Sequence, residues 1–78
     1  SEEDQRRKEL DHFQSAHKLK GTSLRDGAAW ALIDGRVVRI GERIDGFELK
    51  RVERYRVELV KDGLTATLTL PLPYRSAP

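Results

Sequence analysis

Four Asp-Gly pairs divide the chain and constrain its fold more than any other feature. They stand at positions 26–27, 34–35, 45–46 and 62–63, between short apolar runs. A two-residue turn of type I′ needs a positive φ at both central residues, which Asp tolerates and Gly adopts freely. We therefore expect tight hairpins at Asp34-Gly35 and Asp62-Gly63 and a turn at Asp26-Gly27. Gly41 and Asp45-Gly46 are expected to bracket a short connection.

The segments between these turns have the residue pattern of strands. Residues 64–70 alternate Leu or Ala with Thr, which is typical of an antiparallel strand with one solvated face. Residues 28–33, "AAWALI", are apolar on both faces, which predicts a central strand covered on both sides. Residues 17–24 form a candidate first strand, and Pro71 and Pro73 end the last one.

Two further strands are expected to alternate strictly. In residues 47–52, Phe47, Leu49 and Arg51 share one face, opposite Glu48, Lys50 and Val52. In residues 55–60, Tyr55, Val57 and Leu59 share the apolar face. Together the segments predict an all-β domain over residues 17–70, a small antiparallel β-sandwich or partly open barrel of about six short strands.

Residues 1–16 differ from the rest because they are polar and contain neither Gly nor Pro. Ser1 can cap a helix, and Glu2, Glu3 and Asp4 would favour its first turn. Leu10, Phe13 and His17 recur at helical spacing, but this stripe is thin. The pattern predicts a linker or a frayed short helix, with disorder as the alternative, and residues 71–78 read as a C-terminal tail.

The residue types present argue against an enzyme. The 78 residues include no Cys, and the glycines are spread singly through turns instead of forming a phosphate-binding loop. His12 and His17 are five positions apart, which is poor spacing for shared metal ligands, and both are expected to be exposed. We therefore expect no catalytic site, no metal and no cofactor. No apolar run reaches the roughly 18 residues of a membrane span.

Nucleic-acid binding is an alternative that the composition does not favour. Fifteen Lys and Arg against 13 Asp and Glu give a net charge of +2, and the charges are interspersed. A small barrel would bind bases through aromatics set among arginines. Trp30, Phe47 and Tyr55 are better explained as core residues, and the outward arginines alternate with glutamates as cross-strand ion pairs would.

Several short patterns follow one another along residues 17–70. They are Leu-x-Gly-Thr at Leu19, Gly21 and Thr22; Ala-x-Ile at Ala29, Ala31 and Ile33; a hairpin and a "VxxGExIxG"-like step at Val38, Gly41, Glu42, Ile44 and Gly46; an Arg54, Tyr55, Arg56, Val57 and Leu59 step; and a closing turn and strand at Gly63, Leu68 and Leu70. In this order they resemble the periplasmic homology-region domain of the type II secretion inner-membrane protein C. Secretion protein B, pilus biogenesis protein K and, more distantly, pilus lipoprotein P are also similar.

The resemblance implies a six-stranded β-sandwich in the periplasm, held by an inner-membrane anchor outside this chain. It also implies a partner, the N-terminal periplasmic domain of the outer-membrane secretin, and contact with the inner-membrane secretion platform. We expect docking along the first strand and at two outward arginines. The expected contact residues are Lys18, Leu19, Lys20, Gly21, Thr22, Ser23, Arg36 and Arg39. The alternatives are a nucleic-acid-binding barrel and a domain that only self-associates.

Overall fold

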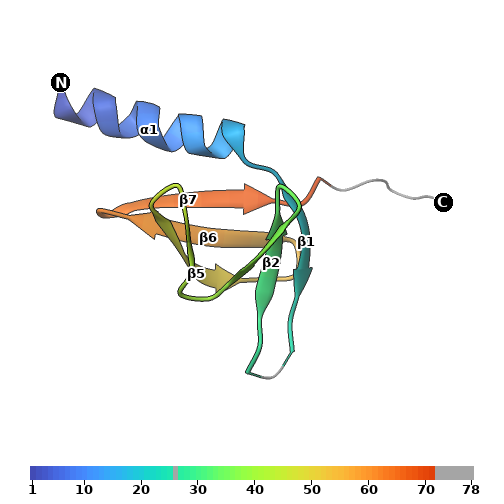
Figure 1. Ribbon diagram of the computed structural model, residues 1–78. Helices are drawn as coiled ribbons and strands as arrows, with labels where there is room; N and C mark the ends of the chain where they lie inside the picture. Colours follow the sequence, from blue (N-terminus) through green and yellow to red (C-terminus); the bar gives the residue numbers. More distant parts are fainter. Residues whose placement is uncertain (26, 72–78) are drawn as a thin grey trace.

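The protein is one helix followed by short antiparallel strands (Figure 1). The computed structural model describes residues 1–25 and 27–71. Within them the elements are α1 (Glu2–Ala16), β1 (Leu19–Ser23), β2 (Trp30–Ile33), β3 (Arg36–Arg39), β4 (Arg43–Ile44), β5 (Phe47–Val52), β6 (Arg56–Lys61) and β7 (Leu64–Thr69). The predicted all-β fold is confirmed. The strand beyond the expected six is β4, which occupies two residues of the predicted short connection.

The strands form two antiparallel sheets, of order β1-β2-β3 and β4-β5-β6-β7. In Figure 1, β1 and β2 run across the direction of β6 and β7, so the two sheets pack nearly orthogonally. The chain passes between the sheets at Gly41 and Glu42, where the Glu42 N–H donates to the Arg39 carbonyl oxygen at 2.9 Å. The outer strands are β1 and β3 in the first sheet and β4 and β7 in the second, and residues of β1 and β7 line a common groove.

The Asp-Gly turns have the backbone that the sequence predicts. Asp34, Asp45 and Asp62 are the non-glycine residues with positive φ in the described residues, at 54°, 50° and 48°. The glycine that follows each has φ of 81° to 84°. Ile33 pairs with Arg36 and Lys61 with Leu64, so the two predicted hairpins are confirmed. The Asp45-Gly46 pair closes a third hairpin, between β4 and β5. The predicted turn at Asp26-Gly27 includes residue 26, which lies outside the described residues.

A single core joins both sheets and the helix. Its buried side chains are Phe13, Leu19, Ala31, Ile33, Val38, Ile44, Phe47, Leu49, Val57, Leu59, Ala66 and Leu68. The alternation predicted for residues 64–70 is confirmed, with Leu64 and Leu70 partly buried at its ends. Phe13 is the contribution of α1, and its ring stacks on that of Phe47 with centroids 4.1 Å apart.

Two side chains lie differently from the strict alternation. A register shift between Leu49 and Arg51 moves the end of β5 by one residue, so Val52 packs against the core while Arg51 is exposed. Tyr55 is 55% exposed instead of core, because β6 begins only at Arg56 and Tyr55 lies in the turn before it. Both corrections arise where a bulge or turn interrupts the two-residue period.

β2 is the central strand of its sheet, as predicted, but it is covered unequally on its two faces. Ala31 and Ile33 are fully buried, whereas Trp30 and Leu32 are half-buried. The prediction that both faces are covered is therefore correct for one face only. Trp30, which was expected in the core, is half-buried and lies outside the buried cluster.

The N-terminal segment is a regular helix of 15 residues. Ser1 Oγ accepts a hydrogen bond from the Asp4 N–H at 3.3 Å, which confirms the predicted cap. Figure 1 shows α1 lying alongside β7. Gln14 Oε1 accepts from the Thr67 N–H at 3.0 Å, and Glu9 pairs with Lys61. A helix of this length is marginal alone, so these contacts and Phe13 hold it on the sheet.

Candidate docking surface

β1 is an edge strand that contains five of the expected contact residues, Leu19 to Ser23, and Lys18 directly precedes it. It pairs within its sheet only with β2. Lys18 and Lys20 are exposed, and Gly21, Thr22 and Ser23 are half-buried. Leu19 is 1% exposed and belongs to the core, so its side chain cannot touch a partner. The strand therefore offers backbone groups and two lysine side chains.

The two ends of β1 differ in how well they could accept another strand. Leu19 pairs with Ile33 and Gly21 with Leu32, which leaves Lys20 as the extra residue of a bulge. Bulges and lysines are devices that protect edge strands from unwanted pairing. From Gly21 to Ser23 the register is regular. An incoming strand would therefore find its continuous template in the second half of β1.

Arg36 and Arg39 lie at the other edge of the same sheet. Both are exposed on β3, where Arg36 pairs with Ile33 and Arg39 with Trp30. The Arg39 N–H donates to Glu42 Oε1 at 2.8 Å. Because β2 separates β1 from β3, one added strand cannot contact both sets. The structure thus divides the predicted contact residues into two separate surfaces.

A shallow groove runs between β1 and β7 below the end of α1. Its lining residues are Gln14, His17, Lys18, Leu19, Lys20, Thr67, Leu68, Thr69 and Pro71. Its polar groups include two lysines and two threonine hydroxyls, and carboxylates are absent from this lining. The groove widens the candidate docking surface beyond β1 and gives it a basic character.

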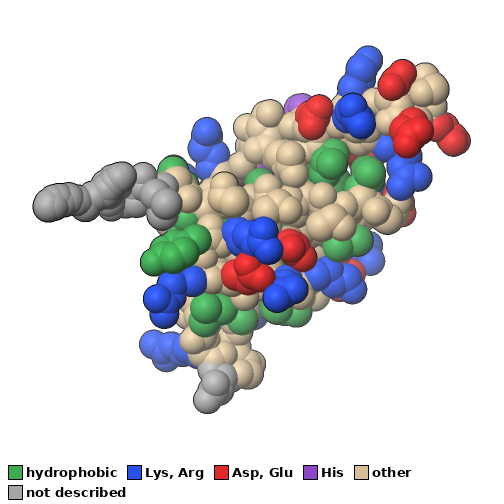
Figure 2. Space-filling view, turned by 180° about the vertical axis from the view of Figure 1, so that it is seen from behind, with side chains coloured by type: hydrophobic (Ala, Val, Ile, Leu, Met, Phe, Trp, Pro, Cys, Tyr) green, Lys and Arg blue, Asp and Glu red, His purple; other side chains and the backbone are tan. Residues whose placement is uncertain are grey.

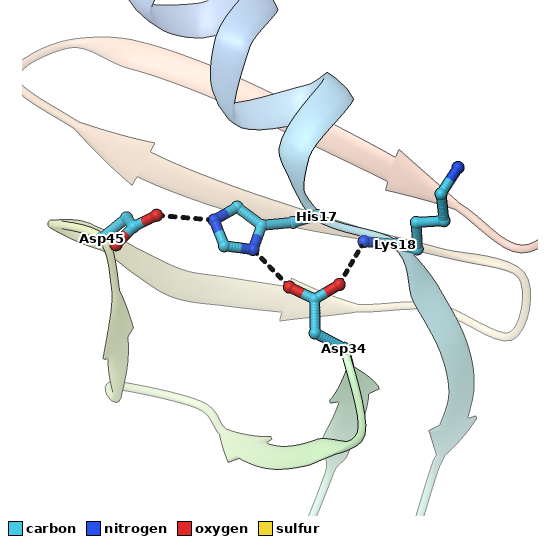
Figure 3. A network of polar contacts seen from close by, with 4 residues as sticks. All are labelled: His17, Lys18, Asp34 and Asp45. Atoms are coloured by element: carbon cyan, nitrogen blue, oxygen red, sulfur yellow. Dashed lines mark hydrogen bonds and ion pairs between the residues drawn. The ribbon is translucent and has the colours of Figure 1, made fainter.

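His17 links three parts of the fold at one end of this groove (Figure 3). It follows α1, and its backbone N–H donates to the Phe13 carbonyl oxygen at 3.1 Å. In the side chain, Nδ1 contacts Asp34 Oδ2 and Nε2 contacts Asp45 Oδ2 at 2.7 Å. Asp34 Oδ1 also accepts from the Lys18 N–H at 2.8 Å. We call these four groups, His17, Asp34, Asp45 and the Lys18 N–H, the His17 junction.

The opposite charges in the His17 junction shift the pKa values of His17 and Asp34. Burial alone would lower the pKa of His17, but hydrogen bonds and attraction from Asp34 and Asp45 outweigh it and raise that pKa above 6.5. The hydrogen bond from His17, together with that from the Lys18 N–H, lowers the pKa of Asp34 below 3.8. Each group favours the charged form of the other.

The exposure predicted for His17 is wrong. Its side chain is 12% exposed, whereas His12 is exposed as expected. The signal was the helical stripe of Leu10, Phe13 and His17, which is the face that α1 turns toward the sheet. The imidazole stands between the two carboxylates, and no cluster of three metal-ligating side chains occurs in residues 1–25 and 27–71.

The outer side of the second sheet carries a network of opposite charges. Glu53 contacts Arg51 at 2.9 Å and Arg56 at 2.6 Å, and Glu58 contacts Arg56 at 3.8 Å. The hydrogen bond from Arg56 lowers the pKa of Glu53. The arginines do pair with glutamates, but these pairs join residues two or three positions apart in the sequence instead of crossing between strands as expected. Figure 2 shows basic and acidic side chains next to one another over this view of the molecule.

Comparisons with known proteins add no relative. Neither the protein-family models, nor the curated proteins, nor the solved structures contain a match to this chain. Among the described residues, α1 is too short and too polar to cross a membrane. The resemblance to secretion-system domains therefore remains a prediction from the order of the sequence motifs.

Proposed function

We propose that this chain is a non-enzymatic adaptor domain of a type II secretion or related type IV pilus system. It docks on the N-terminal periplasmic domain of the outer-membrane secretin and connects that protein with the inner-membrane platform. In this proposal the domain works in the periplasm, and a segment outside this chain anchors it to the inner membrane. It needs no cofactor, since its product is a binding surface.

The motifs that carry the resemblance fall on strands and turns of the fold. Leu19, Gly21 and Thr22 belong to β1, and Ala31 and Ile33 are the buried residues of β2. The glycines of the middle motif take positive φ, at 94° for Gly41 and 84° for Gly46. A sequence and a fold that agree at these positions support the family assignment that we propose.

The observation that carries the docking role is the position of β1. It is an edge strand with a regular register from Gly21 to Ser23, beside a groove with basic side chains. An extended segment can add to such an edge through backbone hydrogen bonds, while the flanking side chains select the partner. The basic groove favours a partner strand with acidic neighbours.

A backbone NMR titration with the secretin N-terminal domain from the same organism tests the proposal. We expect shifts concentrated on β1 and on the groove residues of β7, with β3 unaffected. Titration with a single-stranded oligonucleotide serves as the comparison, and we expect no Trp30 quenching from it. If the backbone amide shifts did not change at a high concentration of the secretin domain, the docking role would be wrong. A response to the oligonucleotide alone would favour the nucleic-acid alternative.

A further inference from the structure

We propose that His17 is a proton-dependent lock that fastens α1 and the start of β1 to two hairpin turns. The lock is closed when the imidazole is doubly protonated and loosens when one proton is lost. The geometry of the His17 junction carries this inference, because each ring nitrogen faces a carboxylate oxygen (Figure 3). The lock is a property of the domain alone and holds whether or not the docking role is correct.

The count of donors and acceptors requires the protonated ring. An ionised carboxylate only accepts hydrogen bonds, and a neutral imidazole has only one N–H to donate. With neutral His17, either Asp34 or Asp45 would therefore face a nitrogen lone pair. The imidazolium donates to both carboxylates at once, so this arrangement fits only the charged form.

The surroundings of the ring favour the same form. His17 is the C-cap of α1, where the helix dipole favours a positive charge, and the last turn of α1 contains no basic residue. Lys20 near Asp34, and Lys61 near Asp45, oppose it by attracting the same carboxylates. Both ring nitrogens contact the carboxylates directly, so the carboxylates dominate.

The lock connects elements that are distant in the sequence. Asp34 belongs to the turn between β2 and β3, and Asp45 to the turn between β4 and β5. Asp34 also holds both backbone groups of Lys18, since its own N–H donates to the Lys18 carbonyl oxygen at 3.0 Å. Loss of a proton from His17 therefore weakens the seating of α1 and of the residue that leads into β1.

An NMR titration of the imidazole on the intact chain tests the lock. We expect both ring nitrogens of His17 to carry protons at pH 6.5 and the midpoint to lie above that value. The amides from Phe13 to Lys18 should shift with the same midpoint. Hydrogen-exchange protection of α1, corrected for intrinsic rates, should fall by roughly tenfold across the transition, as expected for losing a charged hydrogen bond.

Two variants with the same turn chemistry supply the control. Asp45→Asn removes one carboxylate but keeps a residue that tolerates positive φ, whereas Asp62→Asn makes the same change in a turn that does not contact His17. Asp45→Asn should lower the midpoint of His17, and Asp62→Asn should leave it unchanged. A His17 midpoint at or below 6.5, or helix amides that ignore the titration, would overturn the proposal.

The consequence for docking rests on the proposed function. If β1 is the docking strand, secretin binding should weaken as pH rises through the His17 midpoint, because the start of β1 loosens. Absence of any binding would defeat the proposed function but leave the lock intact, since the ring titration needs no partner. A His17 midpoint at or below 6.5, together with secretin binding that does not change with pH, would defeat the lock and leave the proposed function standing.

Discussion

His17 gives the stability of the chain a specific dependence on pH. A histidine whose pKa is raised in the folded state contributes fully below its ordinary value of 6.5, and the contribution disappears as pH rises through the raised pKa. Asp34 behaves in the opposite sense, because its lowered pKa stabilises the fold above 3.8 and this is lost as pH falls through the lowered value. The His17 junction is therefore strongest between these two ordinary values.

A comparison of His17→Asn with the parent chain isolates this effect. We expect the variant to be less stable at pH 6 and the difference in free energy of unfolding to shrink steadily toward pH 9. Urea denaturation at half-unit pH steps measures it. His12→Asn is the control, because His12 is exposed on the same helix, and it should track the parent at every pH. A constant difference for His17→Asn would contradict the assignment.

Alanine substitutions at two glycines can distinguish the cost of a strained backbone from the cost of a steric clash. Gly35 has φ of 82° with open space around it, whereas Gly21 is extended in β1 with the Leu32 Cβ at 3.9 Å from an added methyl group. Gly35→Ala should destabilise the fold by about 1 kcal/mol, because the left-handed conformation is unfavourable for alanine. Gly21→Ala should be neutral or slightly stabilising. Thermal unfolding of both variants checks this, and equal effects would contradict the turn assignment.

At the scale of elements, α1 contributes to the core through one side chain. Phe13 is 2% exposed and stacks on Phe47. Phe13→Ala should destabilise the chain by about 3–5 kcal/mol, the usual cost of a buried Phe-to-Ala change. Leu10→Ala, at a half-buried position of the same stripe, should cost clearly less. Chemical denaturation measures both.

The outcome of that comparison decides whether the helix is part of the folding unit. A small domain has only a few kcal/mol of stability, so Phe13→Ala should leave it close to unfolding at room temperature. If Phe13→Ala and Leu10→Ala were both without effect, α1 would be an appendage and the stacking on Phe47 would have no energetic weight.

The sequence predicts the local elements well because their causes are local. The Asp34-Gly35 and Asp62-Gly63 turns follow from backbone preferences of two residues, and the alternation of Leu and Thr follows from the strand period. The bulge before Arg51 and the exposure of Tyr55 do not follow, since both depend on how neighbouring strands align. The docking of α1 was hidden for the same reason, because its apolar stripe is short and its other contacts are polar.

In the candidate site, too, some features follow from the local sequence and others depend on how the strands are arranged. The edge position of β1 was a reasonable expectation, but the placement of Arg36 and Arg39 at the opposite edge needed the strand order. The His17 junction joins residues 17, 34 and 45, and nothing in the local sequence around any of them indicates the others. The turns at Asp34-Gly35 and Asp45-Gly46 bring the two carboxylates to the end of the helix, and this depends on the tertiary fold.

For the whole molecule, the fold offers two basic edges on one three-stranded sheet. Lys20 on β1 and Lys18 just before it lie beside the groove, and β3 carries Arg36 and Arg39. A partner that responds only to positive charge would treat the two edges alike, because each edge carries two basic side chains. A partner that adds a strand to β1 would not, because its contacts would be confined to that edge and to the groove beside it.

The most direct measurement is the affinity of the secretin N-terminal domain for two charge-matched double variants. Lys18→Glu with Lys20→Glu, and Arg36→Glu with Arg39→Glu, change the net charge by the same amount at opposite edges of the sheet. We predict that the lysine pair weakens binding at least about tenfold, or roughly 1.4 kcal/mol, while the arginine pair stays within about twofold of the parent. Equal losses in the two variants, or a larger loss from the arginine pair, would contradict docking at β1.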